Sequence, residues 1–290
     1  MNDALLAPLR ERVLAARRIV FFTGAGMSAE SGIPTFRDAL TGLWARFDTT
    51  TLASPEGYRA DPSLVWGWYE WRRMKVMQAA PNAGHIAISD FIRSHPTKLA
   101  EVITQNVDDL HERAGCTHVT HLHGRILIPR CFTCSRPARP TLIESIPDEP
   151  EGGRRVEPPC CDRCNGTLRP GVVWFGESLP QVEFKQASAA AREAEVLIVI
   201  GTSGVVEPAA SLVRIAKEAG AFIISINPNE TMAARYADAV VRDTAVSVLP
   251  TLLKESTTVA LADVHLSPIC PVAPRVPSPN VSTLFVNGNA

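Results

Sequence analysis

The chain has 290 residues, of which 46% are hydrophobic and 20% are charged, and its formal net charge is -1 at pH 7. This is the composition of a globular protein with about two domains, and the mixed charges lack the basic face that nucleic acid requires. The longest strand-like apolar block, Val196 to Ile200, is far shorter than the roughly 20 residues that span a bilayer. Nucleic-acid and membrane partners are therefore excluded.

Apolar blocks bounded by turn residues predict six strands. Residues 1–18 come first, and because their leucines recur at helical spacing we interpret them as the first helix of the fold and not as a targeting segment. The predicted strands are Arg18 to Thr23, Leu99 to Thr104, Val119 to Leu122, Val196 to Gly201, Ala221 to Asn227 and Ala239 to Val241. Helical patterns, including 209–219 and 232–236, lie between most of them. This alternation predicts an α/β fold with a Rossmann-like parallel sheet and helices on both faces.

Two stretches interrupt this alternation. Residues 49–80 are strand-free and carry an aromatic helix that opens at Asp61 and Pro62, while residues 131–164 are rich in proline and contain paired cysteines. We interpret the two as a smaller domain, a helical module plus a zinc-binding module, with a ligand cleft beside it. The Rossmann-like domain then comprises residues 1–48, 81–130 and 165–255. The proline-rich remainder, residues 256–290, is predicted to be a disordered tail.

A glycine turn follows the first predicted strand. It matches G-x-G-x-x-A with Gly24, Ala25, Gly26, Ser28 and Ala29. In this motif the first glycine permits a tight turn, the second lets the backbone approach a pyrophosphate, and the small last residue lets a helix pack closely. The second strand with its acidic residue about 20 positions on is missing. A loop with Phe36 and Arg37 follows instead, which suits an enzyme that encloses and consumes its nucleotide; a plain surface loop also fits.

Polar residues end two other predicted strands. Gln105, Asn106 and Asp108 follow the second strand, and Gly201, Thr202 and Ser203 follow the fourth. Ligands bind at the carboxyl ends of parallel strands, so Asn106 and Asp108 are candidates to face a ribose and a nicotinamide amide. The alternative is that both simply cap the helix that starts near Asp109.

Among seven histidines, His123 is the best candidate for chemistry because it ends a predicted strand. A neutral imidazole can accept a proton near pH 7 and so act as a general base. His121 and His123 could share one strand face, which leaves a two-histidine metal site open. We expect His85, His111 and His118 to be structural.

Four of the seven cysteines form two Cys-x-x-Cys pairs, Cys131 with Cys134 and Cys161 with Cys164. Four thiolates complete a tetrahedral Zn²⁺ shell with no open position, which predicts one structural zinc ion. Cys160 is an alternative to Cys161, and oxidation to disulfides is the other interpretation. A zinc-thiolate site favours a reducing, cytoplasmic compartment.

Six motifs occur in the order in which sirtuins, the NAD-dependent protein deacylases, carry them. They are "GAGMSAESGIPTFRD", "TQNVDDLHERAG", "HLHG", the two cysteine pairs, "LRPGVVWFGE" and "IGTSGVVEPAA". The chain therefore resembles sirtuins over residues 10 to 253. The resemblance implies an NAD site formed by Gly24, Ala25, Gly26, Ser28, Phe36, Arg37, Gln105, Asn106, Asp108, Gly201, Thr202, Ser203, Asn227 and Ala245.

The resemblance also implies a reaction, with acyl-lysine proteins or peptides as substrates and a monomer favoured. The acyl carbonyl oxygen attacks the anomeric carbon of the nicotinamide ribose as nicotinamide departs. His123 then deprotonates a ribose hydroxyl, and the acyl group passes to ADP-ribose. Asn106 and Asp108 lie near that carbon in this scheme, where positive charge develops.

Tyr69 and Arg72 resemble the pair found in the sirtuin branch that removes succinyl and malonyl groups. Their i, i+3 spacing places both on one helix face, where a guanidinium can bind a distal acyl carboxylate and a phenol can add a hydrogen bond. We expect the neighbouring Arg73 and Lys75 to be solvated.

Three other functions remain open at this stage. The same NAD site could transfer ADP-ribose to protein. The zinc-binding segment could be an interaction module with a merely structural glycine turn. A metallohydrolase would instead use His121 and His123.

Overall fold

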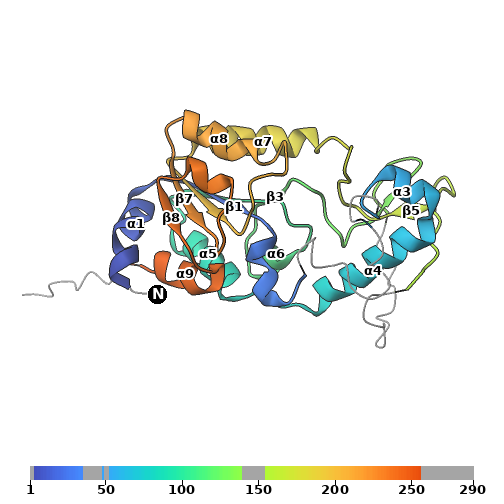
Figure 1. Ribbon diagram of the computed structural model, residues 1–290, viewed down its shortest axis with the longest axis horizontal. Coiled ribbons are helices and arrows are strands. Elements are labelled where there is room, and N and C mark those ends of the chain that lie inside the picture. Colours follow the sequence, from blue (N-terminus) through green and yellow to red (C-terminus); the bar gives the residue numbers. More distant parts are fainter. Residues whose placement is uncertain (1–2, 35–47, 49–51, 139–153, 256–290) are drawn as a thin grey trace, which may run out of the picture. The chain divides into compact units, whose positions relative to one another are not determined.

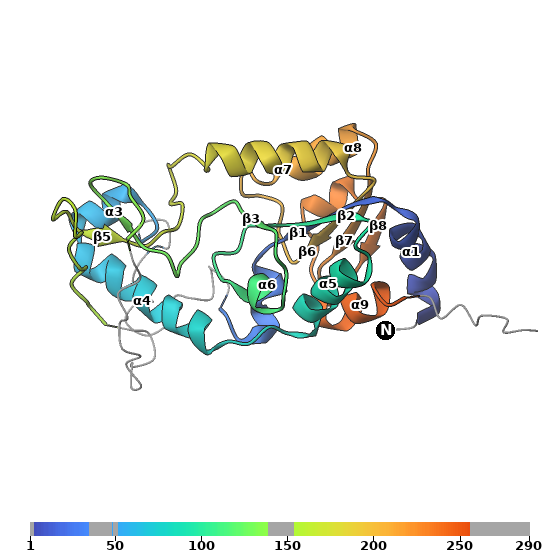
Figure 2. The ribbon, with the colours of Figure 1, turned by 180° about the vertical axis from the view of Figure 1, so that it is seen from behind.

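The computed structural model describes residues 3–34, 48, 52–138 and 154–255. Six strands form one sheet in the order β3, β2, β1, β6, β7, β8, and every neighbouring pair is parallel (Figures 1 and 2). Their bounds are β1 Arg18–Thr23, β2 Leu99–Thr104, β3 Val119–His121, β6 Val196–Ile200, β7 Phe222–Ile226 and β8 Ala239–Val241. The predicted parallel sheet is confirmed.

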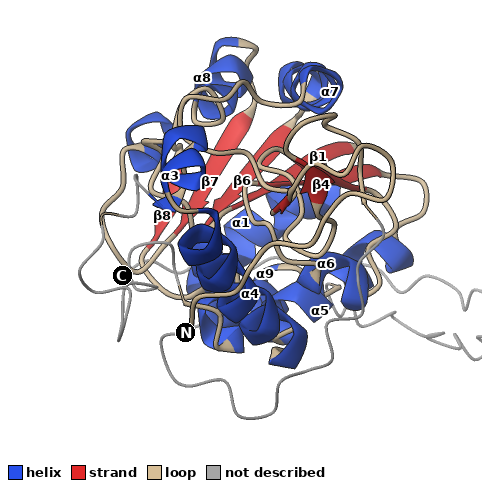
Figure 3. Ribbon diagram, turned by 90° about the vertical axis from the view of Figure 1, so that its right-hand side faces the viewer, coloured by secondary structure: helices blue, strands red, loops and turns tan. Residues whose placement is uncertain are grey.

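Helices cover both faces of the sheet. α1 (Asp3–Ala15), α5 (Ala83–Ser94) and α9 (Ala245–Leu252) lie on one face, and α7 (Gln181–Glu193) and α8 (Ser211–Glu218) lie on the other (Figure 3). The pattern 232–236 forms a 3-10 helix, η4 (Ala233–Tyr236), and not an α-helix. Burial on both sides explains why the central strands are continuous apolar runs in place of alternating ones.

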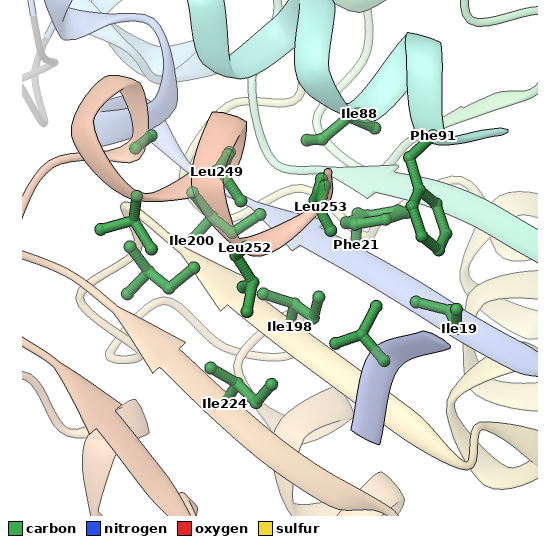
Figure 4. Packing of buried hydrophobic residues seen from close by; sticks show 14 of the residues in the cluster. Ile19, Phe21, Ile88, Phe91, Ile198, Ile200, Ile224, Leu249, Leu252 and Leu253 are labelled. Carbon is green, nitrogen blue, oxygen red and sulfur yellow. The ribbon is translucent and has the colours of Figure 1, made fainter. Parts of the chain in front are cut away.

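Successive residues of β1 enter different cores. Ile19 and Phe21 pack on the α1, α5 and α9 side, whereas Val20 and Phe22 pack on the α7 and α8 side. In the first of these cores, Figure 4 shows Phe91 of α5 against Phe21, and their ring centroids are 6.0 Å apart in an edge-on arrangement. This packing holds the sheet rigid beneath the strand ends.

A third cluster of buried side chains is largely aromatic. It involves α3 (Pro55–Ala60) and α4 (Pro62–Gln78), where the Asp61 carboxylate caps α4 by accepting from Leu64 N at 3.0 Å. Tyr58, Trp68 and Trp174 are among its members. Elsewhere, β4 (Arg130–Cys131), which contains the first cysteine of the two pairs, pairs with β5 (Leu168–Arg169) in an antiparallel two-stranded sheet. The domain boundaries drawn from the sequence stay a prediction.

Some predicted features fall outside the described residues. They are the loop residues Phe36 and Arg37 and the tail 256–290. Within the described residues, no helix is long and apolar enough to cross a membrane.

Truncation of Phe91 should test the core beneath the sheet. Phe91→Ala should lower the free energy of unfolding by about 3–5 kcal/mol, because the side chain is 2% exposed and its removal leaves a cavity. Ile86→Ala on the same helix is the control, since Ile86 is 47% exposed, and its cost should be below about 1 kcal/mol. Urea denaturation measures both. Equal losses would contradict the packing described.

Candidate active site

The sheet reverses its strand order between β1 and β6, and two glycine turns meet there. Gly24 N donates to Ile200 O at 2.9 Å, and Gly26 N donates to Gly201 O at 2.8 Å. A Cβ on Gly26 would lie 2.7 Å from Gly201 Cα, and Gly201 itself has a φ of +61°. The crevice outside such a reversal is where open α/β sheets bind ligands.

The structure corrects one reason given for the G-x-G-x-x-A motif and adds another. A Cβ on Gly26 would meet the backbone of Gly201, so the missing side chain lets the two turns pack together, and the approach of a pyrophosphate to this glycine stays a prediction. Ala29 is exposed and begins a 3-10 helix, η2 (Ala29–Ser31), which follows another, η1 (Ala25–Met27). The prediction that Ala29 lets an α-helix pack closely is therefore wrong.

Ser28 connects the glycine turn to the end of β2. Asn106 Nδ2 donates to Ser28 Oγ at 3.1 Å, and a hydrogen bond from Ser28 also supports the Asp108 carboxylate. Burial raises the pKa of Asp108. Asp108 Oδ1 also accepts at 3.1 Å from the N of Leu110, the first residue of α6 (Leu110–Arg113), although the N-cap residue of that helix is Asp109; the Asn106 side chain reaches the turn instead. The two residues predicted for one site thus share Ser28 as a partner.

His123 is held in a defined orientation and protonation state. Its Nδ1 lies 3.0 Å from the carbonyl oxygen of Gln105. A carbonyl only accepts, so Nδ1 carries the hydrogen and, in the neutral ring, the lone pair is on Nε2. Burial lowers the pKa of His123, and the bond to Gln105 opposes part of that effect. The ring is therefore neutral near pH 7 and suited to accept a proton at Nε2.

His121 is engaged differently. Its Nδ1 lies 3.1 Å from the Asn106 carbonyl oxygen, and its Nε2 lies 2.8 Å from Glu112 Oε1. Both ring nitrogens lie within hydrogen-bond distance of protein oxygens, so neither is free to bind a metal in this arrangement. This weighs against the metallohydrolase with His121 and His123.

The ends of β2, β6 and β7 are joined by polar side chains. Gln105 Nε2 donates to Thr202 Oγ1 at 2.8 Å, and Asn227 Nδ2 donates to Thr202 O at 3.5 Å. Ser203 accepts from Met232 N at 3.0 Å through its carbonyl. Ala245 is the first residue of α9 and is 4% exposed. The polar residues predicted at separate strand ends thus lie along one edge of the sheet.

Two further histidines lie buried below the glycine turn. His111 Nε2 is 3.1 Å from Thr23 Oγ1, His85 Nε2 is 3.5 Å from Ser28 Oγ, and the two rings are 4.8 Å apart. Burial lowers the pKa of His85 to about 4 and that of His111 well below its ordinary value. Both act as neutral supports, as their positions in the sequence predict.

Tyr69 and Arg72 lie on α4 next to the β2 end of the site. The Arg72 guanidinium carbon is 4.9 Å from the Trp68 ring centroid and 5.7 Å from that of Tyr69. Burial lowers the pKa of Arg72, and its electrostatic interactions with Tyr69 and Asp108 oppose this. Arg72 therefore lies close enough to Asp108 to interact with it.

Arg73, the next residue on α4, is not solvated as predicted. Its guanidinium pairs with the Glu70 carboxylate at 2.8 Å, and its side chain is 11% exposed. An i, i+3 partner on the same helix explains the difference.

The four cysteines of the two pairs come together. Their Sγ atoms all lie within 4.8 Å of one another, with Cys131 to Cys164 at 3.4 Å and Cys134 to Cys161 at 3.9 Å. Zn–S bonds of about 2.3 Å give a tetrahedron whose edges are about 3.8 Å, so the donor set fits one Zn²⁺. Cys160 is exposed and stands outside this group.

The backbone around each cysteine pair repeats the same turn. Ser135 N donates to Cys131 O and Asn165 N donates to Cys161 O, both at 3.0 Å. Ser135 and Asn165 are left-handed, with φ near +58° and +57°. This repetition aims both pairs of sulfurs at one point, as a closed structural metal site requires.

The sequence analysis missed a cluster around Trp174. Trp174 Nε1 donates to the Tyr69 hydroxyl at 3.1 Å, and Glu177 accepts from the Trp174 backbone N at 2.8 Å. Trp174 and Glu177 do lie in the motif "LRPGVVWFGE", but the motif does not reveal that the indole bonds to a tyrosine more than 100 residues earlier.

Comparisons with known proteins give one consistent family. The Sir2 family model matches residues 24–208. An NAD-dependent protein deacylase of Methylococcus capsulatus is 53% identical over 253 residues, which are 87% of this chain and 96% of that protein. The crystal structure of a Sir2 homologue with NAD has a TM-score of 0.75 at 44% identity and covers 87% of this chain and 93% of its own. That of Sir2Tm with a propionylated peptide has a TM-score of 0.70 at 28% identity, covering 86% and 96%.

Serine substitutions should identify the zinc ligands. Cys164→Ser should release the metal and lower the melting temperature, because three thiolates no longer close the shell. Cys160→Ser, a few residues away, should keep one zinc ion per chain. Elemental analysis and thermal unfolding of the purified variants measure both. Loss of zinc from the Cys160 variant with retention in the Cys164 variant would contradict the assignment.

Proposed function

The chain belongs to the Sir2 family, and on this premise we propose that it is an NAD-dependent protein-lysine deacylase that removes succinyl and malonyl groups, and acetyl groups more weakly. Its products would be nicotinamide and O-acyl-ADP-ribose. One observation carries the acyl preference: Arg72 and Tyr69 share a face of α4 and interact electrostatically with each other, and Arg72 also does so with Asp108. A half-buried cation beside the site favours an acyl group that ends in a carboxylate.

We assign the edge of strand ends to NAD. The glycine turn of β1 and the turn after β6 supply backbone groups, while Ser28, Gln105 and Asn227 supply polar side chains among the residues described above. The relative of known structure that binds NAD supports this assignment. Phe36 and Arg37 belong to the same proposal from the sequence alone.

His123 supplies the general base in this proposal. NAD, when bound, supplies the sugar carbon that is attacked by the acyl oxygen and that loses nicotinamide. His123 accepts a proton from a sugar hydroxyl at Nε2, while Nδ1 keeps its hydrogen bond to Gln105 O. Asn106 and Asp108 provide polar groups beside the positive charge that develops during nicotinamide departure.

Arg72 supplies the acyl selectivity. Charge-assisted hydrogen bonds contribute about 1.5–3 kcal/mol each, which corresponds to roughly 10 to 150-fold in kcat/KM between a substrate that has the carboxylate and one that lacks it. The Tyr69 hydroxyl adds a neutral donor to the same group. The propionylated peptide bound by Sir2Tm supports a peptide-borne acyl chain as the substrate class.

The cysteine cluster supports a location in the reducing cytoplasm. Zinc binding requires thiolates, and disulfide-forming compartments would oxidise them.

Incubation with NAD and a succinyl-lysine peptide tests the reaction class. Mass spectrometry should find free lysine peptide, nicotinamide and succinyl-ADP-ribose. Labelled protein in their place would indicate an ADP-ribosyltransferase at the same NAD site. No rise of the melting temperature with NAD would favour a zinc interaction module instead.

Loss of the Arg72 charge should change the substrate preference. Arg72→Met should lower kcat/KM for a succinyl-lysine peptide by roughly 10 to 150-fold and for the acetyl peptide far less. Lys75→Met, which removes a cation 6.0 Å from the Trp71 ring centroid on the same helix, should leave the ratio unchanged. Steady-state kinetics on both peptides measure the succinyl-to-acetyl ratio of kcat/KM for each variant. An equal loss on both substrates for Arg72→Met would show a role in folding or general binding.

The pH dependence should reveal the general base. Because the pKa of His123 is lowered by burial, kcat/KM should hold constant down to below the ordinary histidine value of about 6.5 and fall only at lower pH, where the base becomes protonated. His123→Ala should lower the rate by about 10² to 10⁴-fold and abolish this acid limb. An acid limb above pH 6.5, or one that persists in the variant, would argue against His123 as the base.

A further inference from the structure

The Tyr69 hydroxyl can both accept and donate a hydrogen bond, and a residue distant in the sequence occupies it as an acceptor. Trp174 Nε1 donates to the Tyr69 hydroxyl oxygen at 3.1 Å, and the rings are 6.3 Å apart. The two side chains are 2% and 3% exposed. An indole N–H can only donate, so the phenol oxygen accepts in this bond. The phenol hydrogen must therefore point to another acceptor.

We propose that Trp174 is a positioning residue for acyl selectivity, because its indole N–H occupies the acceptor side of Tyr69 and so directs the phenol hydrogen to the distal carboxylate of the acyl group. This inference rests on the proposed function. Arg72 provides the charge for that carboxylate, whereas the Tyr69 and Trp174 pair provides direction.

The indole is held on two sides, which makes it suited to positioning. The Arg169 guanidinium carbon lies 3.3 Å from the Trp174 ring centroid, and Glu177 accepts from the Trp174 backbone N at 2.8 Å. Glu177 also accepts from Arg169 Nη2 at 3.0 Å and from Arg130 Nη2 at 3.1 Å. Arg169 donates in addition to Val172 O at 2.9 Å. The Trp174 backbone, the Trp174 ring and the Glu177 carboxylate are thus fixed together.

Both arginines of this group belong to the β4 and β5 strand pair, which flanks the four clustered cysteines in the sequence. Arg130 precedes Cys131 in β4, and Arg169 ends β5, which pairs with β4 in antiparallel fashion. The β4 and β5 pair therefore supports Trp174, and Trp174 in turn donates to Tyr69.

The phenol remains a donor throughout the neutral pH range. Burial raises the pKa of Tyr69 to about 12, so the hydroxyl keeps its hydrogen. A donated hydrogen bond to the oxygen polarises the O–H group and strengthens what it donates in turn. An acetyl group offers no distal acceptor, so only substrates with a terminal carboxylate gain from this arrangement.

The test is kinetic. Trp174→Phe removes the N–H and keeps an aromatic ring, and it should lower kcat/KM for the succinyl peptide by about 3 to 12-fold, mainly through KM, as expected for one neutral hydrogen bond. The acetyl peptide should lose much less. In the Trp174→Phe background, Tyr69→Phe should cost less than in the wild type, because both changes act on the one hydrogen bond from Tyr69 to the carboxylate, the first by removing its direction and the second by removing its donor.

Glu177→Gln is a second variant that leaves the indole in place. It keeps an acceptor for the Trp174 backbone but removes the charge that holds Arg169 over the ring, so it should shift the succinyl-to-acetyl ratio in the same direction.

Equal losses on both peptides, or additive losses for Trp174→Phe and Tyr69→Phe, would overturn the inference and leave Trp174 as core packing. If the Arg72→Met selectivity loss occurs while Trp174→Phe leaves the ratio unchanged, this inference fails and the proposed function stands.

Discussion

The hydrogen bond from His123 Nδ1 to the Gln105 carbonyl is the interaction on which the site depends. This bond decides which ring nitrogen of His123 carries the lone pair. Because the acceptor is a backbone carbonyl, rotation of the Gln105 side chain does not remove it. Gln105 is itself fixed twice, since its N–H donates to Thr23 O at 2.9 Å and its side chain donates to Thr202. The base, the end of β1 and the turn after β6 are thereby held in one network.

The parallel sheet is what makes that network possible. Parallel strands bring their carboxyl ends to one edge, and both faces must then be covered by helices. Packing of Phe21 against Phe91 on one face, and of Val20 and Phe22 on the other, keeps this edge in place. Arg72 of α4 interacts with Asp108, and Tyr69 of the same helix contacts Trp174, whose ring lies under the Arg169 guanidinium of β5. The contacts that we propose for NAD and those that we propose for the acyl group thus come from different elements, so under this proposal the acyl preference can vary while His123 stays in place.

The sequence was sufficient for the features that depend on local pattern. Strands such as Val196–Ile200 are uninterrupted apolar runs, the cap Asp61 precedes Pro62, and the cysteine pairs carry their own spacing. Features that depend on a distant partner were not predictable. Gly26 is small because of Gly201, and Tyr69 is oriented by Trp174; neither contact leaves a periodic signal. Arg73 shows that even a neighbouring charge three residues away can bury a side chain expected in solvent.

The most direct measurement is a crystal structure of the protein with NAD bound. The account predicts a hydroxyl oxygen of the nicotinamide ribose within hydrogen-bond distance of His123 Nε2, roughly 2.6–3.2 Å, while Nδ1 stays on the Gln105 carbonyl. A ring rotated so that Nε2 bonds the protein, or a sugar bound away from the end of β3, would contradict it.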